Sequence, residues 1–275
     1  PPRSTLFPYT TLFRSDQLKR EAPSVFAEVA HDSTSARYTQ IPTIQVVDAL
    51  RTEGWMPVLA AETRVRDASK MGFAKHLLRF RHQDELGRAF QVHDKVSEIV
   101  VVNSHDGTST YQLHAGIFRF ACANGMIVAD STLETQRVRH SGDVVGNVIE
   151  GVYSIVEDLP EVESKIERFR GIRLHTDEQR ALAGAAMALR WDGVAPVVAD
   201  TVLQPKRVSD RGDDLWTVFN RIQENVIRGG LRGFTHDQNG RPKRTRTREV
   251  KSVNENVRLN KALWMLADEM AKLKA

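Results

Sequence analysis

The sequence predicts an α+β protein in which an antiparallel β-meander, with a helix packed before it, is followed by a mostly helical C-terminal half. Residues 98–128 read as two strands joined by a polar turn, and a short third strand follows Asn124 and Gly125. Two runs, residues 58–66 and 73–82, alternate in the way that is typical of strands. Beyond residue 141, apolar residues recur at the spacing of amphipathic helices.

The composition is that of a globular protein with a substantial core. Of the 275 residues, 41% are hydrophobic and 27% are charged. The single cysteine, Cys122, excludes an intramolecular disulfide and favours a reducing compartment. No apolar run approaches the roughly 18 residues that a membrane-spanning helix needs. We therefore expect a cytoplasmic protein with no membrane partner and no cofactor, and homo-oligomerisation stays open.

The first fifteen residues, PPRSTLFPYTTLFRS, repeat Thr-Leu-Phe and lack the apolar centre of a signal peptide. They read as translated adapter sequence, so residues 1–15 are predicted to be a non-native leader. We then expect an α+β sheet core over residues 16–135 and a helical part over residues 136–275 that packs on this core.

A helix is predicted from Thr43, its expected N-cap, to Gly54, where glycine ends it. It carries one apolar stripe, formed by Ile44, Val47 and Leu50. We expect this stripe to lie on the sheet.

Two strands are predicted next, over residues 55–67 and 73–82. The alternation of the first strand places Leu59 and Ala61 inward. If the two strands pair, five basic side chains stand together on the other face of the sheet: Arg64, Arg66, Lys75, Arg79 and Arg81. Such a stripe can follow a phosphate backbone without reading bases. The alternative is an ordinary exposed sheet face, which needs polar residues in any case.

The C-terminal half is predicted to contain helices over residues 141–171, 176–191 and 213–229, and from residue 252 onward. Pro160 either kinks the first of these helices or separates two shorter ones. The last two helices begin with residues typical of N-caps, namely Asp213 or Asp214 and Ser252.

Basic residues are concentrated near the C-terminus. From Leu203 onward the chain has 16 Lys and Arg against 9 Asp and Glu, although the net charge of the whole is only +4. Residues 239–251, NGRPKRTRTREVK, form a linker or a long hairpin between two helices. Its threonines and basic residues suit phosphate contact, and the absence of aromatic residues argues against base stacking there. The predicted contacts are Arg241, Lys243, Arg244, Arg246 and Arg248. A solvated loop is the alternative.

An enzymatic site is a second possibility, near the turn at residues 103–107. A hydrolase or nuclease could gather His76, His105, Asp106, His114 and Asn124. The histidine spacing matches no compact metal-binding motif, so no metal site is predicted. Cys122, between two alanines, reads as packing. Aromatic residues of the meander would stack on bases only if they are exposed: Tyr111, Phe118 and Phe120.

Several segments together resemble a known family. They are SARYTQIPT, NSHDGTSTYQLHAGIFRFACANG, DDLWTVFNRIQENVIRGG and VRLNKALWMLADEM. In this order they are similar to the uncharacterised phage/plasmid-like family called domain of unknown function 932, from Arg37 to near the C-terminus. The resemblance implies a phage, plasmid or integrated mobile element as the context, and it brings no catalytic residues to this chain.

The leading functional hypothesis is a non-enzymatic protein of a phage or plasmid that binds nucleic acid, with single-stranded DNA and strand annealing as the candidate ligand and activity. Two alternatives stay open: the hydrolase or nuclease described above, and a protein-interaction or host-defence-countering module that uses the C-terminal helices.

Overall fold

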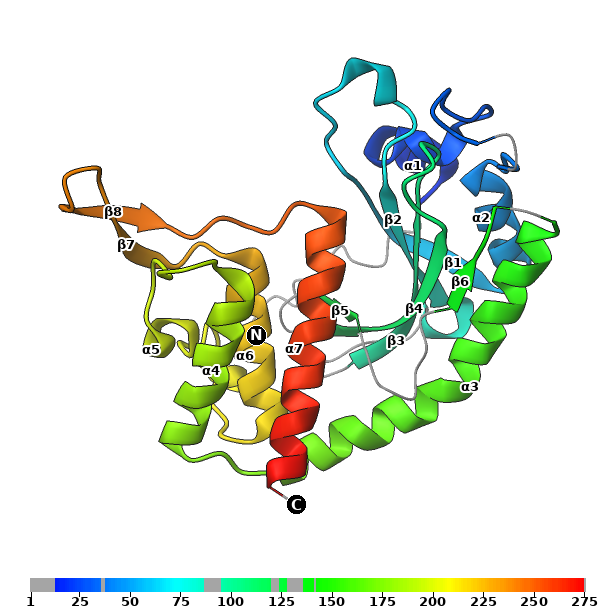
Figure 1. Ribbon diagram of the computed structural model, residues 1–275. Helices are drawn as coiled ribbons and strands as arrows, with labels where there is room; N and C mark the ends of the chain where they lie inside the picture. Colours follow the sequence, from blue (N-terminus) through cyan, green and yellow to red (C-terminus); the bar gives the residue numbers. More distant parts are fainter. Residues whose placement is uncertain are drawn as a thin grey trace, which may run out of the picture. The chain divides into compact units, whose positions relative to one another are not determined.

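The computed structural model describes residues 13–35, 38–86, 95–119, 124–127, 136–140 and 142–274 (Figure 1). The chain divides into two compact units. Unit 1 contains Pro1–Met126 and Leu133–Asp158, and unit 2 contains Ile127–Thr132 and Leu159–Ala275. Within the described residues, no helix is both long enough and apolar enough to span a membrane.

Unit 1 is built around the predicted meander. Its strands are β1 (Trp55–Glu62), β2 (His76–His82), β3 (Lys95–Asn103), β4 (Tyr111–Arg119), β5 (Asn124–Ile127) and β6 (Gln136–Val138). They follow the spatial order β1-β2-β3-β4-β5, and β6 pairs with β4. The pairs β1–β2, β2–β3 and β3–β4 are antiparallel. The α+β class and the meander are therefore confirmed.

Short helices and the first part of a long helix complete unit 1. They are α1 (Ser15–Glu21), η1 (Pro23–Phe26), α2 (Thr43–Thr52), η2 (Ala68–Lys70), η3 (Gln83–Glu85) and α3 (Val144–Gly171). Helix α2 buries Val46, Val47 and Leu50, so the helix predicted before the sheet does pack on it. Helix α3 lies on the same face, because a Cβ on Gly151 would come within 2.6 Å of Leu113 in β4.

The end of the predicted leader lies within the described chain. Helix α1 begins at Ser15, and the amide of Phe13 donates a hydrogen bond to the carbonyl of Pro57 in β1 at 2.9 Å. Phe13 thus contacts the first strand of the sheet.

The predicted faces of β1 are wrong. The pairing of β1 with β2 shifts between Pro57 and Leu59, which leaves one extra residue in β1. As a result Leu59 is 38% exposed, and Glu62 lies opposite His76 and accepts a hydrogen bond from the amide of Ser24. The strand ends at Glu62, so Arg64 and Arg66 lie in the following loop.

Unit 2 consists of the second part of α3, α4 (Thr176–Arg190), α5 (Ala199–Val202), η4 (Val208–Asp210), α6 (Leu215–Arg228), the ribbon strands β7 (Arg232–His236) and β8 (Pro242–Arg246), and α7 (Val253–Leu273). Helix α3 runs through Pro160 without a break. The carboxylate of Asp214 caps α6 by accepting a hydrogen bond from the amide of Thr217. The hydroxyl of Ser252 caps α7 by accepting a hydrogen bond from the amide of Glu255. The mostly helical C-terminal half is confirmed.

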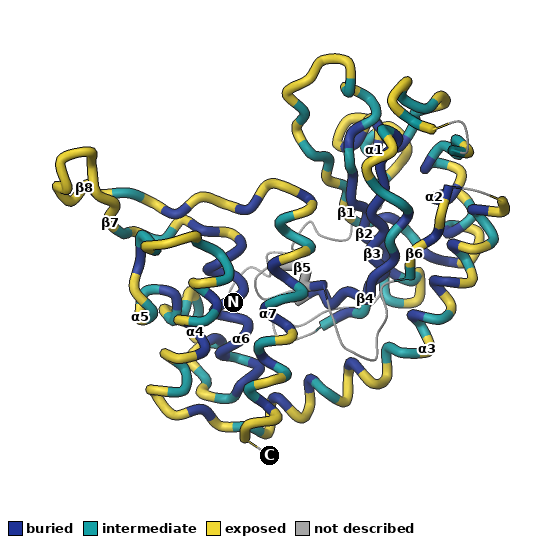
Figure 2. The backbone as a smooth tube through the Cα atoms, in the orientation of Figure 1, coloured by how far each residue is buried: buried dark blue, intermediate teal, exposed yellow. Residues whose placement is uncertain are grey.

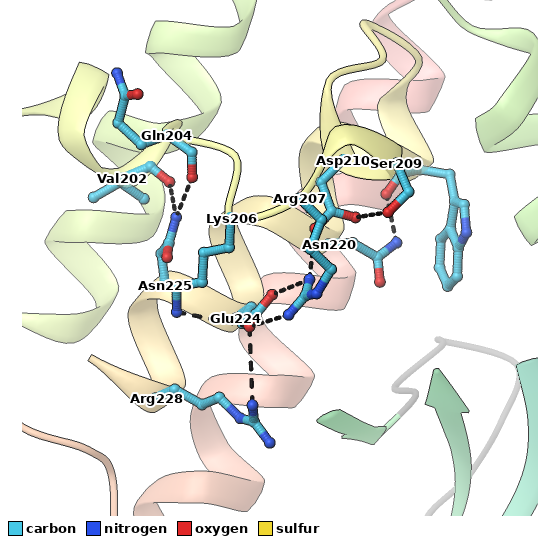
Figure 3. Close-up of polar contacts among 11 residues, drawn as sticks. Val202, Gln204, Lys206, Arg207, Ser209, Asp210, Asn220, Glu224, Asn225 and Arg228 are labelled. Carbon is cyan, nitrogen blue, oxygen red and sulfur yellow. Dashed lines mark hydrogen bonds and ion pairs between the residues drawn. The ribbon is translucent and has the colours of Figure 1, made fainter. Parts of the chain in front are cut away.

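Helix α6 is the centre of unit 2. Every residue from Leu215 to Ile227 except Thr217 is buried, including several polar ones (Figure 2). The burial is tolerated because most of these polar groups are paired; the exceptions among the described residues are Arg221 Nε and Asn225 Oδ1. Arg207 donates to both carboxylate oxygens of Glu224, at 2.7 and 2.9 Å, and Asn225 donates to the carbonyls of Val202 and Gln204 (Figure 3). Helix α6 therefore gives a rigid base to the strands that follow it.

Candidate nucleic-acid interface

The ribbon of β7 and β8 is fixed at its base to the helices of unit 2. The amide of Gly230 donates to the carbonyl of Thr247 at 2.8 Å, and the amide of Val250 donates to that of Ile227 in α6 at 2.8 Å. Gly229 makes the turn between helix and ribbon with φ +65°. A Cβ on Gly229 would lie 2.7 Å from the carbonyl carbon of Arg248, so the two chain segments approach closely only because this residue is glycine.

The edge of β7 is fixed as well. The amide of Phe234 donates to the carbonyl of Pro196 at 2.8 Å, and a Cβ on Gly233 would overlap the same carbonyl oxygen. The segment around Pro196 thus covers one edge and one face of β7, which leaves the opposite face of the ribbon outward.

Cross-strand pairing decides which side chains share the outward face. Arg232 lies opposite Arg246, and Phe234 lies opposite Arg244. Directly opposed residues of an antiparallel pair point to the same side. All four side chains are exposed, and with Gly233 and Thr245 they line a hollow of about 660 Å³. We call Arg232, Phe234, Arg244 and Arg246 the ribbon face.

The ribbon is strongly cationic. Residues 232–248 contain six Lys and Arg and a single carboxylate, Asp237. That carboxylate is engaged in the turn, where it accepts the backbone amides of Asn239 and Arg241. In the described part of the chain, no carboxylate forms an ion pair with Arg232, Arg244 or Arg246. These charges are thus available to an anionic ligand.

The structure distributes the five predicted basic residues of this segment around the ribbon. All are exposed: Arg241, Lys243, Arg244, Arg246 and Arg248. Only Arg244 and Arg246 belong to the ribbon face, whereas Lys243 points to the opposite side with Thr235. The segment is a hairpin, one of the two forms predicted. Arg232 and Phe234 were missed because their position opposite the arginines depends on the register of this hairpin. The turn residues Asp237–Gly240 were the signal that could have revealed it.

The predicted basic stripe on the sheet does not exist. Arg79 and Arg81 are only 4% and 1% exposed, and both donate to the fully buried carboxylate of Glu98, at 2.8 and 2.6 Å. The guanidinium of Arg81 also lies 4.9 Å from the ring centre of Phe118. Assigning these two arginines to phosphate contact was wrong, because both guanidinium groups are buried and pair with the same carboxylate.

The other members of that set differ from each other in environment. Arg64 and Arg66 are exposed in the loop after β1. Lys75 is half-buried, and burial lowers the pKa of its amine. The exposed pair therefore stays a candidate for phosphate contact, separate from the ribbon face.

The predicted histidine site is a buried network around the hydroxyl of Thr43. The Thr43 Oγ1 atom lies 3.0 Å from His76 Nε2 and 2.9 Å from His105 Nε2. Asn103 donates to the same oxygen at 3.1 Å, and Asn103 Oδ1 lies 2.9 Å from His140 Nε2. Thr43 is therefore not the N-cap of α2, as predicted from the sequence; Pro42 occupies that position. The roles of Thr43, Asn103 and His140 were not foreseen.

The three histidines of this network are neutral at pH 7. Burial lowers the pKa of His76 to about 4, that of His105 to about 3 and that of His140 to about 4. His76 Nδ1 donates to the carbonyl of Ala74, so its Nε2 accepts the Thr43 proton, and Oγ1 is left to accept from His105 and Asn103. The Thr43 hydroxyl and the three histidine Nε2 atoms are thus hydrogen-bonded within the core of unit 1, whereas His140 Nδ1 has no hydrogen-bond partner among the described residues.

The remaining residues of the hypothetical enzyme site do not join this network. Asp106 accepts the amide of Thr108 and pairs with Lys70 at 3.5 Å, while His114 is buried on β4. The side chain of Asn124, like Phe120 and Cys122, lies outside the described residues. Where the structure describes the chain, no three His, Cys, Asp or Glu side chains converge as metal ligands. Tyr111 and Phe118 are buried, so they offer no stacking surface.

Comparisons with known proteins place the chain in a family. The family described as Domain of unknown function (DUF932) matches residues 30–264. The UPF0380 protein YfjQ of Escherichia coli (strain K12) is 43% identical over 256 residues, which cover 93% of this chain and 90% of the relative. The UPF0380 protein YafZ of the same organism is 42% identical over the same length, with equal coverage. No solved structure matches. The chain belongs to the family described as Domain of unknown function (DUF932), as its sequence motifs predict.

Proposed function

We propose that this protein binds nucleic acid, without catalysis, and that the ribbon face makes the contact. The observation that carries the proposal is the position of Arg232, Arg244 and Arg246 on one exposed face that no described carboxylate neutralises. Guanidinium groups bind phosphate oxygens through paired hydrogen bonds, and they are weakly hydrated compared with ammonium groups. A two-stranded ribbon anchored to a helical body presents them in a fixed arrangement.

The basic residues around the ribbon face extend this contact. Arg241 in the turn, Lys243 on the opposite side and Arg248 after β8 are exposed, so a flexible polyanion can reach them as well. Their role is to add affinity through charge, because contacts with phosphates carry no sequence information. In a phage, plasmid or integrated element, such a protein would act on DNA during replication or recombination.

Fluorescence anisotropy with labelled single-stranded and double-stranded oligonucleotides tests the proposal. We expect binding at low ionic strength that weakens linearly on a plot of log affinity against log salt concentration. The variant Arg232→Ala/Arg244→Ala/Arg246→Ala should lose most of the affinity. The matched control is Arg170→Ala/Arg173→Ala/Arg180→Ala, which removes the same charge from arginines of unit 2 that pair with carboxylates. Absence of binding, or equal losses in both variants, would refute the proposal.

A further inference from the structure

We infer that Phe234 stacks on an unpaired base, so that the ligand of the ribbon face is a single-stranded nucleic acid. This inference rests on the proposed function of the ribbon. The side chain of Phe234 is 57% exposed, whereas Phe80, Phe169 and Phe219 are at most 3% exposed. Burial of an aromatic ring stabilises a fold, and the ribbon offers Phe234 no second layer to pack against.

The surroundings of the ring select the ligand. Arg244 lies directly opposite Phe234, and the Arg232–Arg246 pair lies two residues along the same face. Same-face neighbours along a strand are roughly 7 Å apart, since each residue rises about 3.4 Å. The guanidinium group of Arg244 thus belongs to the residue opposite the ring, and those of Arg232 and Arg246 belong to the next residues on the same face. Together with the ring they line the hollow of about 660 Å³. Flanking phosphates and one unstacked base match this pattern of charge and aromatic surface.

A duplex fits the ring less well than a single strand. Base faces in a duplex are covered by neighbouring base pairs, so a phenyl ring reaches them only by forcing a step open. Every unpaired base has an exposed face, and stacking on an aromatic side chain tolerates any sequence. An apolar protein partner is also disfavoured, because burying Phe234 would desolvate three guanidinium groups next to it.

An oligomer without bases separates stacking from charge. We would measure the affinities for oligo-dT, for oligo-U and for an abasic deoxyribose-phosphate chain of the same length. The unmodified protein should bind oligo-dT or oligo-U roughly 5- to 100-fold more tightly than the abasic chain. Tighter binding of either oligomer than of the abasic chain supports stacking.

Variants of Phe234 assign this preference to the ring. Phe234→Ala and Phe234→Leu should abolish the preference for bases, and Phe234→Trp should retain it. Arg244→Ala should lower the affinity for the oligomers with bases and the affinity for the abasic chain by the same factor. Because the side chain is exposed, none of these changes removes core packing, and thermal unfolding would verify this.

The outcomes that would contradict stacking can be distinguished from those that would contradict nucleic-acid binding. Equal affinity of the unmodified protein for oligo-dT, oligo-U and the abasic chain would overturn stacking but leave phosphate binding intact. A duplex bound more tightly than either oligomer, with no effect of Phe234→Ala, would also overturn the inference. No binding to any of these ligands would remove the proposed function itself.

Discussion

Phe234 and Arg244 lie directly opposite each other in the β7–β8 ribbon, so an exposed ring and a guanidinium share one face. This relationship arises from the hairpin register and not from proximity in the sequence. Its rigidity depends on the attachment of β7 to Pro196 and of the ribbon base to α6. The sheet of unit 1, which dominates the sequence pattern, buries Arg79 and Arg81 and so does not present them on an exposed face.

Each single substitution of an arginine on the ribbon face should reduce the salt dependence of binding by the contribution of one phosphate contact. Each phosphate contact to a single strand adds about 0.7 to the slope of log affinity against log salt concentration. We therefore expect Arg232→Ala, Arg244→Ala and Arg246→Ala each to reduce the slope by up to about this amount. Arg170→Ala serves as the control. Unchanged slopes in all three variants would mean that these arginines do not contact phosphates.

Gly233→Ala should detach β7 from the segment around Pro196. The added methyl group would overlap the Pro196 carbonyl oxygen, so the strand must move and its Phe234 amide loses its acceptor. We expect a loss of about 1–3 kcal/mol in the free energy of unfolding. Hydrogen exchange should show a less protected Phe234 amide. Thr235→Ala, two residues further on the same side, is the matched control, and equal protection in the two variants would contradict the proposed anchoring.

The buried Glu98 should be essential to the stability of unit 1. Glu98→Ala removes the carboxylate that pairs with the buried Arg79 and Arg81, and breaking a buried ion pair costs about 3–5 kcal/mol in comparable cases. Replacing all three residues by apolar ones of similar size, as in Arg79→Met/Arg81→Met/Glu98→Leu, should restore most of this loss. Urea unfolding measures both. If Glu98→Ala were as stable as the unmodified protein, the ion pairs would not matter to the fold.

These residues also show what a single sequence can reveal. The run of β-branched residues at Ile99–Val102 and the polar turn after it predict the meander, because both signals are local. The alternation in β2 places Arg79 and Arg81 on the face opposite Leu78 and Phe80, but it does not say what covers that face. Their partner Glu98 belongs to another strand, and the pairing of strands is not a local property.

Two other errors have similar causes. A bulge between Pro57 and Leu59 reverses the faces of β1, and nothing in the local pattern marks the extra residue. Thr43 has the residue type and position of an N-cap, but its hydroxyl is used by histidines that are 33 and 62 residues away in the chain. In the ribbon, the basic residues of β8 were evident, whereas the opposed Phe234 depends on register.

The histidine network predicts a loss of stability in mild acid. The three buried histidines stay neutral in the folded unit down to a pKa of about 4 for His76 and His140 and about 3 for His105, whereas the usual pKa is 6.5. Between these values the unfolded chain binds more protons. The stabilisation is therefore complete above pH 6.5 and is lost as the pH falls toward 4, by up to about 1.4 kcal/mol per pH unit for each histidine.

Urea unfolding at about pH 7.5 and about pH 5 would measure this dependence. His105→Gln, which cannot be protonated in this range, should reduce it. His236→Gln removes an exposed histidine from the ribbon and is the control. An identical pH dependence in the unmodified protein and His105→Gln would show that this histidine does not couple folding to protons.

The hydroxyl of Thr43 should be more important than its methyl group. Thr43→Val keeps the shape of the side chain but leaves His76 Nε2 without its donor, and it leaves His105 and Asn103 without their acceptor. An unpaired buried polar group costs about 1–3 kcal/mol, so we expect a loss of at least about 3 kcal/mol. Thr43→Ser keeps the hydroxyl and loses only a methyl group, so its cost should be about 1 kcal/mol. If urea unfolding ranked Thr43→Ser as the less stable variant, packing and not the network would explain why threonine occupies this position.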